Sequence, residues 1–361
     1  MHKIMSFSEL FHRSAVTWPS HQISSEYFAN KTVLITGAGG SIGSALSSHI
    51  ASLQPRKLIL LGRGEHSLYA VMSRLSTAYP DVDLQPILVD IQSLSQLNYV
   101  FASSNIELVF HTAAYKHVNI LEKSPCQAVL NNVLGTRNVV RASQHAKVDR
   151  LIFISTDKSV EPVGILGATK KLCECILSRE AIRSVTDLVS VRFGNIFRSS
   201  GNVVGLFEQQ AKRDRCITIT DPNAIRFFMD IEDATHTIIT AGMEAQDNEV
   251  AILDVGDPIR VGELADSIVK SFNLVPHVDV RYDYIGLQPG EKLIEKLYTD
   301  AEEATMRRIG SMMYTRTDIS DFLDDESVIE SLIERARAQD DAMVRLILAK
   351  CVPGYTPMVN E

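Results

Sequence analysis

The feature that most constrains this chain is a glycine-rich turn at residues 37–43, which reads Gly-Ala-Gly-Gly-Ser-Ile-Gly. An apolar, β-branched run at 32–36 precedes the turn and an amphipathic stretch at 41–53 follows it, which predicts strand, tight turn and helix. Glycine is required in such a turn because a side chain would block a bound pyrophosphate and separate the helix from the strand. The helix N-terminus would offer free amides and a partial positive charge. The pattern predicts a dinucleotide site that includes Gly37, Gly40, Ser41, Ile42 and Gly43.

The alternation of strand and helix continues along the chain. Strands are predicted at 57–61, 84–89, 108–110 and 150–155, with helical segments such as 65–78 between them. Nearly continuous apolar strands that alternate with helices indicate a parallel sheet covered on both faces. The predicted fold class is therefore α/β, with a Rossmann-type, doubly wound parallel sheet.

After about Gly194 the segments become shorter and mixed, which predicts a smaller C-terminal α/β substrate lobe. We divide the chain into an N-terminal arm at 1–29, an NAD(P)-binding Rossmann domain at 30–195 and 228–256, and a substrate-binding lobe at 196–227 and 257–361. The arm carries a helical pattern from Phe7 to His12, followed by Trp18-Pro19. We expect it to pack on the main body.

The composition limits the classes of partner. A formal charge of -8 over 361 residues argues against nucleic acid, whose binding needs a concentrated basic face. No apolar run approaches the ~20 residues of a membrane helix, and the N-terminus lacks the apolar stretch of a signal peptide. We therefore expect a cytoplasmic protein with no membrane partner. The five cysteines and ten histidines show no ligand spacing, so reduced thiols and no metal site are expected.

Two positions after predicted strands bear on the choice of dinucleotide. At the end of the second strand, where NAD-binding chains carry an acidic residue, this chain reads Leu61-Gly62-Arg63. Arg63 either pairs with a 2′-phosphate, which favours NADP while leaving NAD possible, or is a solvated surface arginine. Asp90 and Ile91 follow the third strand and are placed to meet the adenine, although an aspartate there can also be a helix cap.

A group of polar residues follows the strand predicted at 150–155. The strand ends in Ser155-Thr156-Asp157-Lys158, and the next helix carries Lys170. Ligands bind beyond the carboxyl ends of the strands in open α/β sheets, so Thr156, Asp157, Lys158 and Lys170 are the predicted catalytic residues. The alternative is that Asp157 caps a helix and Lys158 lies on the surface.

Several motifs together resemble one family. They are Thr-Gly-Ala-Gly-Gly-Ser-Ile-Gly-Ser at 36–44, Phe-His-Thr-Ala-Ala-Tyr-Lys-His-Val at 110–118, Asn-Asn-Val-x-Gly-Thr at 131–136, Ser-Thr-Asp-Lys at 155–158, Arg-Phe-Gly-Asn at 192–195, Arg-Phe-Phe-Met at 226–229 and Gly-Leu-x-Pro-Gly-Glu-Lys at 286–292. This set is similar to the extended short-chain dehydrogenases/reductases. Within them it resembles the UDP-N-acetylglucosamine 4,6-dehydratases of capsular polysaccharide biosynthesis. The arm resembles the segment that follows a membrane region in larger members.

The resemblance implies an NADP-dependent reaction on a UDP-sugar without net oxidation. Hydride leaves C4, water is lost across C5 and C6, and hydride returns to C6. Lys158 would be the base for the C5 proton and Asp157 the acid for the C6 hydroxyl. Thr156 would bind the C4 oxygen, and Lys170 would hold the nicotinamide ribose. For Lys158 to act as a base its pKa has to fall, which burial and positive charge from Lys170 or the nicotinium would promote.

The resemblance also implies further ligand contacts. For the cofactor these are Ala113, Ala114, Lys116 and Asn132, and for the sugar nucleotide they are Lys116, His117, Asn195, Val203, Val204, Arg226, Arg260 and Glu291. Asn132 is expected to orient the active-site lysine through the backbone or a water. Arg226 is a diphosphate candidate because a planar guanidinium binds two phosphate oxygens at once. The alternative is a salt bridge from Arg226 to Asp230 or Glu232.

Two residues depart from the family pattern. Leu166 stands where most of the superfamily has a tyrosine that removes the C4 hydroxyl proton, so a water or Asp157 would have to serve instead. Gln288 stands where relatives usually carry arginine, and Arg260 is the residue that could replace that contact. The competing interpretations are a UDP-sugar 4-epimerase, which normally depends on the tyrosine, and a catalytically inactive dinucleotide-binding scaffold. A homo-oligomer is expected because relatives assemble through helices that flank the sheet.

Overall fold

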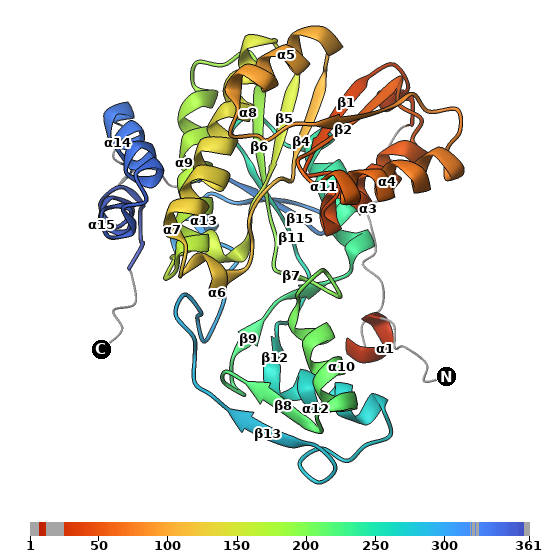
Figure 1. Ribbon diagram of the computed structural model, residues 1–361, viewed down its shortest axis with the longest axis vertical. Coiled ribbons are helices and arrows are strands. Elements are labelled where there is room, and N and C mark those ends of the chain that lie inside the picture. Colours follow the sequence, from red (N-terminus) through yellow and green to blue (C-terminus); the bar gives the residue numbers. More distant parts are fainter. Residues whose placement is uncertain (1–6, 12–24, 318, 320–321, 323–324, 357–361) are drawn as a thin grey trace.

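A nine-stranded sheet organises the molecule, and a smaller lobe lies beyond one end of its strands (Figure 1). The computed structural model describes residues 7–11, 25–317, 319, 322 and 325–356. The strands of the large sheet are β1 (Thr32–Thr36), β2 (Lys57–Gly62), β3 (Leu84–Leu88), β4 (Leu108–His111), β5 (Arg150–Ile154), β6 (Asp187–Arg192), β11 (Val250–Leu253), β14 (Arg307–Ile309) and β15 (Met312–Thr315).

Helices cover both faces of this sheet. In chain order the helices of the large domain are α2 (Ser25–Ala29), α3 (Ser41–Ser52), α4 (Glu65–Ala78), α5 (Leu94–Ser104), α6 (Val118–Leu121), α7 (Pro125–Ala128), a π-helix (Val129–Leu134), α8 (Gly135–His145), a 3₁₀ turn (Asp157–Ser159), α9 (Ile165–Ala181), α11 (Ile231–Glu244), α13 (Asp300–Ala304), α14 (Glu326–Arg337) and α15 (Asp341–Cys351). Helices α14 and α15 lie outside the layer that contains α9 (Figure 1). In the described part of the chain, no helix has both the length and the apolar character that crossing a membrane requires.

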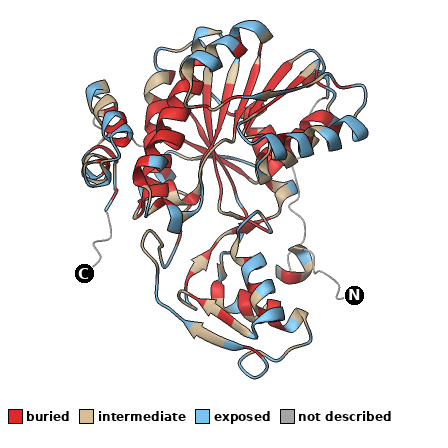
Figure 2. Cartoon of the chain, in the orientation of Figure 1, coloured by how far each residue is buried: buried red, intermediate tan, exposed pale blue. Residues whose placement is uncertain are grey.

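The strand order is β14-β15-β11-β6-β5-β4-β1-β2-β3, with parallel pairing from β3 through to β11. Successive residues of β1 enter different cores: Leu34 joins the cluster under α5, α8 and α9, whereas Val33 and Ile35 join the cluster under α3, α4 and α11. Figure 2 shows the strands buried between these two layers. The predicted α/β class with a doubly wound, mostly parallel sheet is confirmed.

The C-terminal region corrects the predicted division of the chain. Residues 257–361 were assigned to the substrate lobe, but β15 pairs antiparallel with β11 and β14 pairs with β15, so both strands extend the large sheet. Helices α14 and α15 pack on the π-helix, α7 and α9, where Leu332 and Leu348 are fully buried. Arg137 fixes α14 through Glu326 and Glu330, at 3.2 and 2.8 Å. The boundary is wrong because β14 and β15 are only three and four residues long, and strands this short carry little sequence signal.

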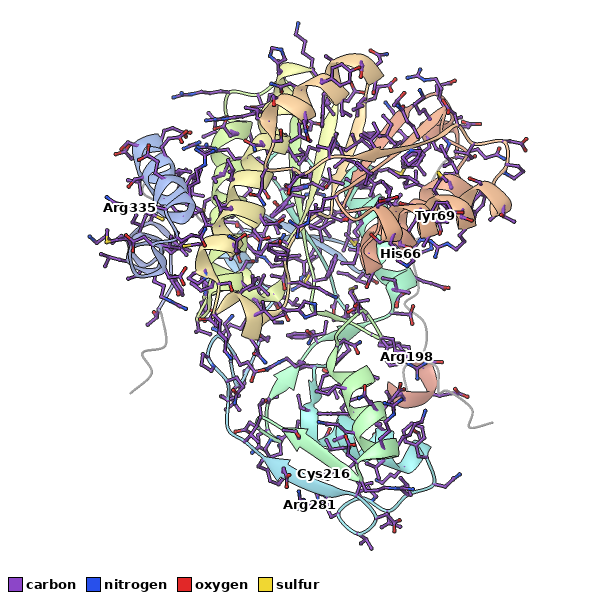
Figure 3. All side chains as sticks on the ribbon, viewed as in Figure 1. His66, Tyr69, Arg198, Cys216, Arg281 and Arg335 are labelled. Atoms are coloured by element: carbon purple, nitrogen blue, oxygen red, sulfur yellow. The ribbon has the colours of Figure 1, made fainter. Side chains whose placement is uncertain are left out.

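The smaller lobe is built from separate stretches of chain. Its elements are α1 (Phe7–Phe11), α10 (Val203–Arg213), β8 (Cys216–Ile219), β9 (Ile225–Arg226), β12 (Ile259–Arg260), α12 (Val261–Ser271) and β13 (Arg281–Tyr284), and β7 (Asn195–Ile196) and β10 (Phe228–Met229) connect it to the sheet. Cys216 and Arg281 occupy paired positions on β8 and β13, and Figure 3 labels both in this lobe.

The N-terminal arm contacts this smaller lobe through α1. The Phe7 and Phe197 rings meet edge to face with centroids 5.6 Å apart, and Leu10 is buried in the lobe's core. Trp18 and Pro19 lie outside the described residues. Helix α2 instead inserts Phe28 into the core of the large domain.

Candidate active site

The glycine-rich turn forms a close junction between β1 and α3. Gly37 has a φ of +68°, and a Cβ there would lie 2.7 Å from the Ala113 backbone. A Cβ on Gly43 would lie 2.2 Å from the Gly37 carbonyl oxygen, so α3 approaches the strand as closely as it does only because residue 43 has no side chain. No side chain caps α3 at Gly40. The first-turn amides, which include those of Ser41 and Ile42, therefore fit the pyrophosphate of a dinucleotide.

Arg63 and Asp90 lie together beyond the ends of β2 and β3. The Arg63 guanidinium stacks on the Tyr115 ring at 4.7 Å, donates to the Tyr115 hydroxyl and lies 3.6 Å from Asp90 Oδ2. Asp90 Oδ1 also accepts the Gln92 amide at 2.9 Å, as in a turn cap. Ile91 is buried against Gly135, so its side chain packs in the core. Arg63 is therefore held in place by its neighbours, where it could meet the ribose end of a dinucleotide.

The loop after β4 is fixed by Asn132 of the π-helix. Asn132 Oδ1 accepts the Tyr115 amide at 2.8 Å and its Nδ2 donates to the Tyr115 carbonyl at 3.1 Å. This loop carries Ala113 and Ala114 past the glycine turn. The Asn132 carbonyl accepts from Cys173 Sγ at 3.2 Å. The expected role of Asn132 in orienting the active-site lysine through its backbone or a water stays a prediction. A π-helix at this position is consistent with a functional site.

Lys170 lies under the end of β5. Its Nζ donates to the Ile154 carbonyl and lies 4.1 Å from the centre of the Phe153 ring. Burial lowers the pKa of Lys170 to about 8. The nearby His111 ring is bonded on both sides, to Thr36 and Thr136, and burial together with Lys170 lowers its pKa to about 3. His111 is therefore a neutral, structural histidine.

The 3₁₀ turn after β5 presents the predicted catalytic residues. Thr156, and not Asp157, is the N-cap of this turn. The Asp157 carboxyl is fully buried, and its Oδ1 accepts from Thr156 Oγ1 at 2.9 Å and from Lys158 Nζ at 3.0 Å. Its Oδ2 is buried without a hydrogen-bond partner among the residues the structure describes. Burial raises the pKa of Asp157, which suits it to hold and donate a proton.

Lys158 lies between two carboxylates. Its Nζ is 3.0 Å from Asp157 Oδ1, 3.6 Å from Glu295 Oε1 and 3.5 Å from the Asn195 side-chain oxygen. Burial lowers the pKa of Lys158, but Asp157 and Glu295 outweigh burial and the net pKa is raised. The expected fall in this pKa is therefore absent from the site as it stands. Lys158 is an ammonium group at rest and has to lose a proton before it can act as a base.

The smaller lobe approaches the glycine turn through the loop at 199–202. Lys116 Nζ donates to Ser199 Oγ at 3.4 Å, and the Ser200 amide donates to Ser41 Oγ at 3.1 Å. His117 packs against Gly201, where a Cβ would lie 2.4 Å from the ring. The candidate dinucleotide cradle and the start of α10 therefore face each other across this loop. Arg198, in the same connection, is labelled in Figure 3.

Arg226, the predicted diphosphate contact, lies on β9 of the smaller lobe. Arg226 Nη1 donates to the Ile225 and Leu293 carbonyls at 2.9 and 3.3 Å, while Asp230 caps α11 by accepting the Glu232 amide. The structure thus gives Arg226 backbone partners in place of the alternative salt bridge.

Four further predicted contacts have a clear position. Val204 is fully buried in the lobe's core, so only its backbone could meet a ligand, whereas Val203 is half-buried. Arg260 is exposed, 3.4 Å from Asn223 and paired in the strand register with Ile225. Glu291 accepts the Gln288 amide at 3.2 Å.

Leu166 faces the core, with 6% of its surface exposed. Its place on α9, one helical turn before Lys170, therefore offers no group for proton transfer. Among the described residues, no cluster of three or more His, Cys, Asp and Glu side chains could hold a metal ion.

Sequence reasoning missed a buried ionic network behind the 3₁₀ turn. Glu174 accepts from Ser155 and Ser159, and its carboxylate pairs with Arg192 at 2.7 Å. Arg192 also pairs with Glu302 at 2.9 Å. The signal in the sequence was a charged residue, Glu174, flanked in the chain by the apolar pairs Leu172-Cys173 and Cys175-Ile176 of α9. The network ties α9 and β6 to the turn that carries Asp157 and Lys158.

The fold and the site together define an extended short-chain dehydrogenase/reductase. The family model for "Polysaccharide biosynthesis protein" matches residues 33–317, and the chain belongs to that family. It is 37% identical over 302 residues to "Capsular polysaccharide biosynthesis protein CapD" of Staphylococcus aureus, covering 83% of this chain and 50% of that protein. It is 35% identical over 295 residues to "Probable polysaccharide biosynthesis protein EpsC" of Bacillus subtilis, covering 81% and 49%. The chain therefore spans about half the length of these two relatives.

Solved structures agree with this placement. Pen from Bacillus thuringiensis matches with a TM-score of 0.75 at 31% identity, over 81% of this chain and 91% of that one. The dTDP-glucose 4,6-dehydratase DesIV from Streptomyces venezuelae matches with a TM-score of 0.65 at 17% identity, over 88% and 99%. This second likeness shows the fold alone. A relative named UDP-glucose 4-epimerase, from Rickettsia bellii, is 28% identical over 79% of this chain and 82% of that protein.

Proposed function

We propose that this protein is an NADP-dependent UDP-N-acetylglucosamine 4,6-dehydratase, giving a UDP-4-keto-6-deoxy sugar for surface glycan synthesis. The observation that carries the proposal is the buried Asp157–Lys158 pair at the end of β5, with Leu166 in place of a tyrosine. An elimination across C5 and C6 needs an acid and a base side by side, and this pair supplies them.

The residues of the site divide the work. When bound, the dinucleotide supplies a hydride acceptor for C4 and a hydride donor for C6. Lys158, once deprotonated, accepts the C5 proton and returns it to C5 when hydride adds to C6. Asp157, whose pKa is raised by burial, donates a proton to the departing C6 hydroxyl. The C4 hydroxyl proton passes to a water, from which Asp157 is reprotonated. Thr156 binds the C4 oxygen, and Lys170 orients the nicotinamide ribose. Arg226 binds the diphosphate of the sugar nucleotide.

The choice of cofactor rests on Arg63. The DesIV structure contains NAD, which supports a nicotinamide dinucleotide in this fold. The guanidinium of Arg63, held beyond the end of β2 by Tyr115 and Asp90, favours NADP because it could pair with a 2′-phosphate. The names of CapD and EpsC support a place in polysaccharide biosynthesis.

A UDP-sugar 4-epimerase is the second candidate, favoured by the name of the Rickettsia bellii relative. That reaction would return hydride to the other face of C4 and would need a group to move the C4 hydroxyl proton. Leu166 has no such group. In an epimerase, moreover, the Asp157–Lys158 pair would have no elimination to catalyse. The homo-oligomer and the cytoplasmic location stay predictions.

The test is proton NMR of the protein with NADP and UDP-N-acetylglucosamine in deuterated buffer. A 6-deoxy methyl signal beside a 4-keto or hydrated product is the expected result. Conversion to UDP-N-acetylgalactosamine would identify an epimerase. Unchanged substrate at saturating NADP would reject the proposed substrate and direct attention to another sugar or to the inactive scaffold.

A further inference from the structure

Glu295 is buried in a segment whose apolar neighbours are exposed. Its exposed fraction is 2%, against 42% for Leu293 and 53% for Ile294. A carboxylate is costly to bury unless opposite charges and hydrogen bonds compensate it. The inverted pattern therefore indicates that specific partners hold Glu295 inside the protein.

Those partners belong to the reaction centre. Glu295 Oε1 lies 3.6 Å from Lys158 Nζ, and Oε2 lies 3.1 Å from Lys292 Nζ. Lys292 also donates to the Val160 carbonyl at 2.6 Å, directly after the 3₁₀ turn. Lys292 thus fixes Glu295 to the same turn that carries Asp157 and Lys158.

The same segment is attached to the strand of the diphosphate candidate. The Ile225 amide donates to the Leu293 carbonyl at 2.8 Å, and Arg226 donates to that carbonyl at 3.3 Å. Ile225 and Ile294 form a parallel bridge. The stretch from Lys292 to Glu295 therefore joins β9 of the smaller lobe to the turn after β5.

We propose that Glu295 is a positioning residue of the reaction centre, a second carboxylate that holds the Lys158 ammonium opposite Asp157 and connects it to the strand carrying Arg226. The charged groups facing Lys158 are Asp157, Glu295 and Arg226. Those facing Glu295 are Lys158, Lys292, Arg226 and, across the ammonium, Asp157. Asp157 and Glu295 favour the protonated lysine, and Arg226 opposes them.

In this arrangement Glu295 helps to set the pH at which Lys158 loses its proton and can act as a base. Removing the negative charge of Glu295 leaves Asp157 as the one carboxylate paired with the ammonium in the described part of the chain, and leaves Arg226 in place. The Lys158 proton should then be lost at lower pH. The consequence for turnover rests on the proposed function, whereas the pairing of Glu295 with Lys158 does not.

The first experiment measures the titration of Lys158 in the full chain without substrate. Limiting acetic anhydride acetylates only neutral amines, and mass spectrometry of peptides follows the reaction of Lys158 as pH is varied. We expect E295Q to lower the midpoint by about 1 pH unit or more, within the range for loss of a neighbouring opposite charge. The matched control is E161Q, since Glu161 pairs with Lys296 at 3.0 Å on the surface. Its midpoint should equal that of the wild type. An unshifted midpoint in E295Q would overturn the proposal.

A double-mutant cycle covers the case in which E295Q folds poorly. Urea unfolding of K158M, E295Q and the double variant measures whether the two side chains depend on each other. We expect the double variant to lose less stability than the sum of the single variants. Additive losses would refute the pairing.

Turnover separates this proposal from the proposed function. If the wild type converts UDP-N-acetylglucosamine, the lower pH limb of kcat should move to lower pH in E295Q and stay in place in E161Q. If the wild type shows no conversion, the proposed function fails while the acetylation midpoints still decide the role of Glu295.

Discussion

Two buried lysines at the end of β5 show how neighbours decide the role of a side chain. Burial lowers the pKa of both Lys158 and Lys170. Lys170 rests on the Phe153 ring and a carbonyl, and its pKa falls to about 8. Lys158 has two carboxylates beside it, and its pKa rises. The same residue type therefore has two protonation behaviours in one site. Lys170 can lose its proton near neutral pH, whereas Lys158 stays protonated.

Replacing Asp157 by Asn tests the acid of the proposed elimination. The variant keeps the size of the side chain and its contact with Thr156 but has no proton to donate to the C6 hydroxyl. We expect kcat to fall on the order of 100-fold or more, which is the usual contribution of general acid catalysis. Product formation by NMR measures the rate, and a cofactor titration should show unchanged binding. Turnover close to that of the wild type would assign the acid to another group.

Replacing Arg63 by Ala tests the choice of dinucleotide. Loss of a charged hydrogen bond costs about 1.5–3 kcal/mol, which corresponds to a roughly 10-fold to 100-fold weaker Kd. We expect that loss for NADP and little change for NAD, measured by fluorescence titration. Arg56 precedes β2 and pairs with Glu107 at 2.8 Å, so R56A is the control at the opposite end of the strand. Equal losses for both dinucleotides in R63A would argue against recognition of the 2′-phosphate.

At the scale of the elements, the close packing of α3 against β1 decides which ligand the turn between them can hold. Helix α3 can begin beside the strand because Gly37 adopts a positive φ and Gly43 has no Cβ. The predicted limits of this unit agree with β1 at Thr32–Thr36 and α3 at Ser41–Ser52. The glycine spacing carries the signal because no other residue fits.

Gly43→Ala should disrupt this unit. Its Cβ would lie 2.2 Å from the Gly37 carbonyl oxygen, so the helix has to shift and the amide cradle with it. We expect dinucleotide binding to weaken at least tenfold. Gly62→Ala is the matched control, since a Cβ there meets nothing within 4 Å. Isothermal titration with NADP measures both variants, and unimpaired binding in G43A would show that the cradle tolerates the shift.

The packing of α14 on the π-helix and α7 gives a prediction of stability. Leu332 of α14 is fully buried, and truncating a buried leucine to alanine costs about 2–5 kcal/mol. Leu332→Ala should lower the free energy of unfolding by that amount in urea. Leu346 on α15 is 45% exposed, so Leu346→Ala should change the free energy of unfolding far less. Similar losses in both variants would mean that α14 is not packed as described.

For the whole molecule, a buried neutral histidine links stability to pH. The pKa of His111 is about 3 in the folded protein and about 6.5 in an unfolded chain. Between these values the unfolded state binds more protons, so stability should fall as pH drops below about 6.5. The expected contribution from pH 7 to pH 5 is about 2 kcal/mol, at about 1.4 kcal/mol per pH unit. Urea unfolding at both pH values should show a smaller loss in H111N than in the wild type. An equal loss of stability between pH 7 and pH 5 in both proteins would show that His111 does not cause the pH dependence.

The sequence predicts the large domain better than the rest of the molecule. Periodic apolar patterns place α4 at Glu65–Ala78 and bring Asp157 and Lys158 to the end of β5. Periodicity does not reveal β14, whose strand begins with two arginines, nor the burial of Glu295 beside exposed leucine and isoleucine. Those features depend on partners distant in the chain, so local pattern carries no signal for them.

The smaller lobe is assembled from stretches that leave the large domain and return to it. Helix α10 with β8 and β9 comes from one excursion, and β12, α12 and β13 come from another after β11. No continuous fragment of the gene therefore encodes this lobe. A graft that exchanges this lobe with that of a relative would have to replace both stretches and α1 at once, together with residues 292–295, which join β9 to the turn after β5. Specificity in such a molecule is altered more readily by point substitution than by exchange of modules.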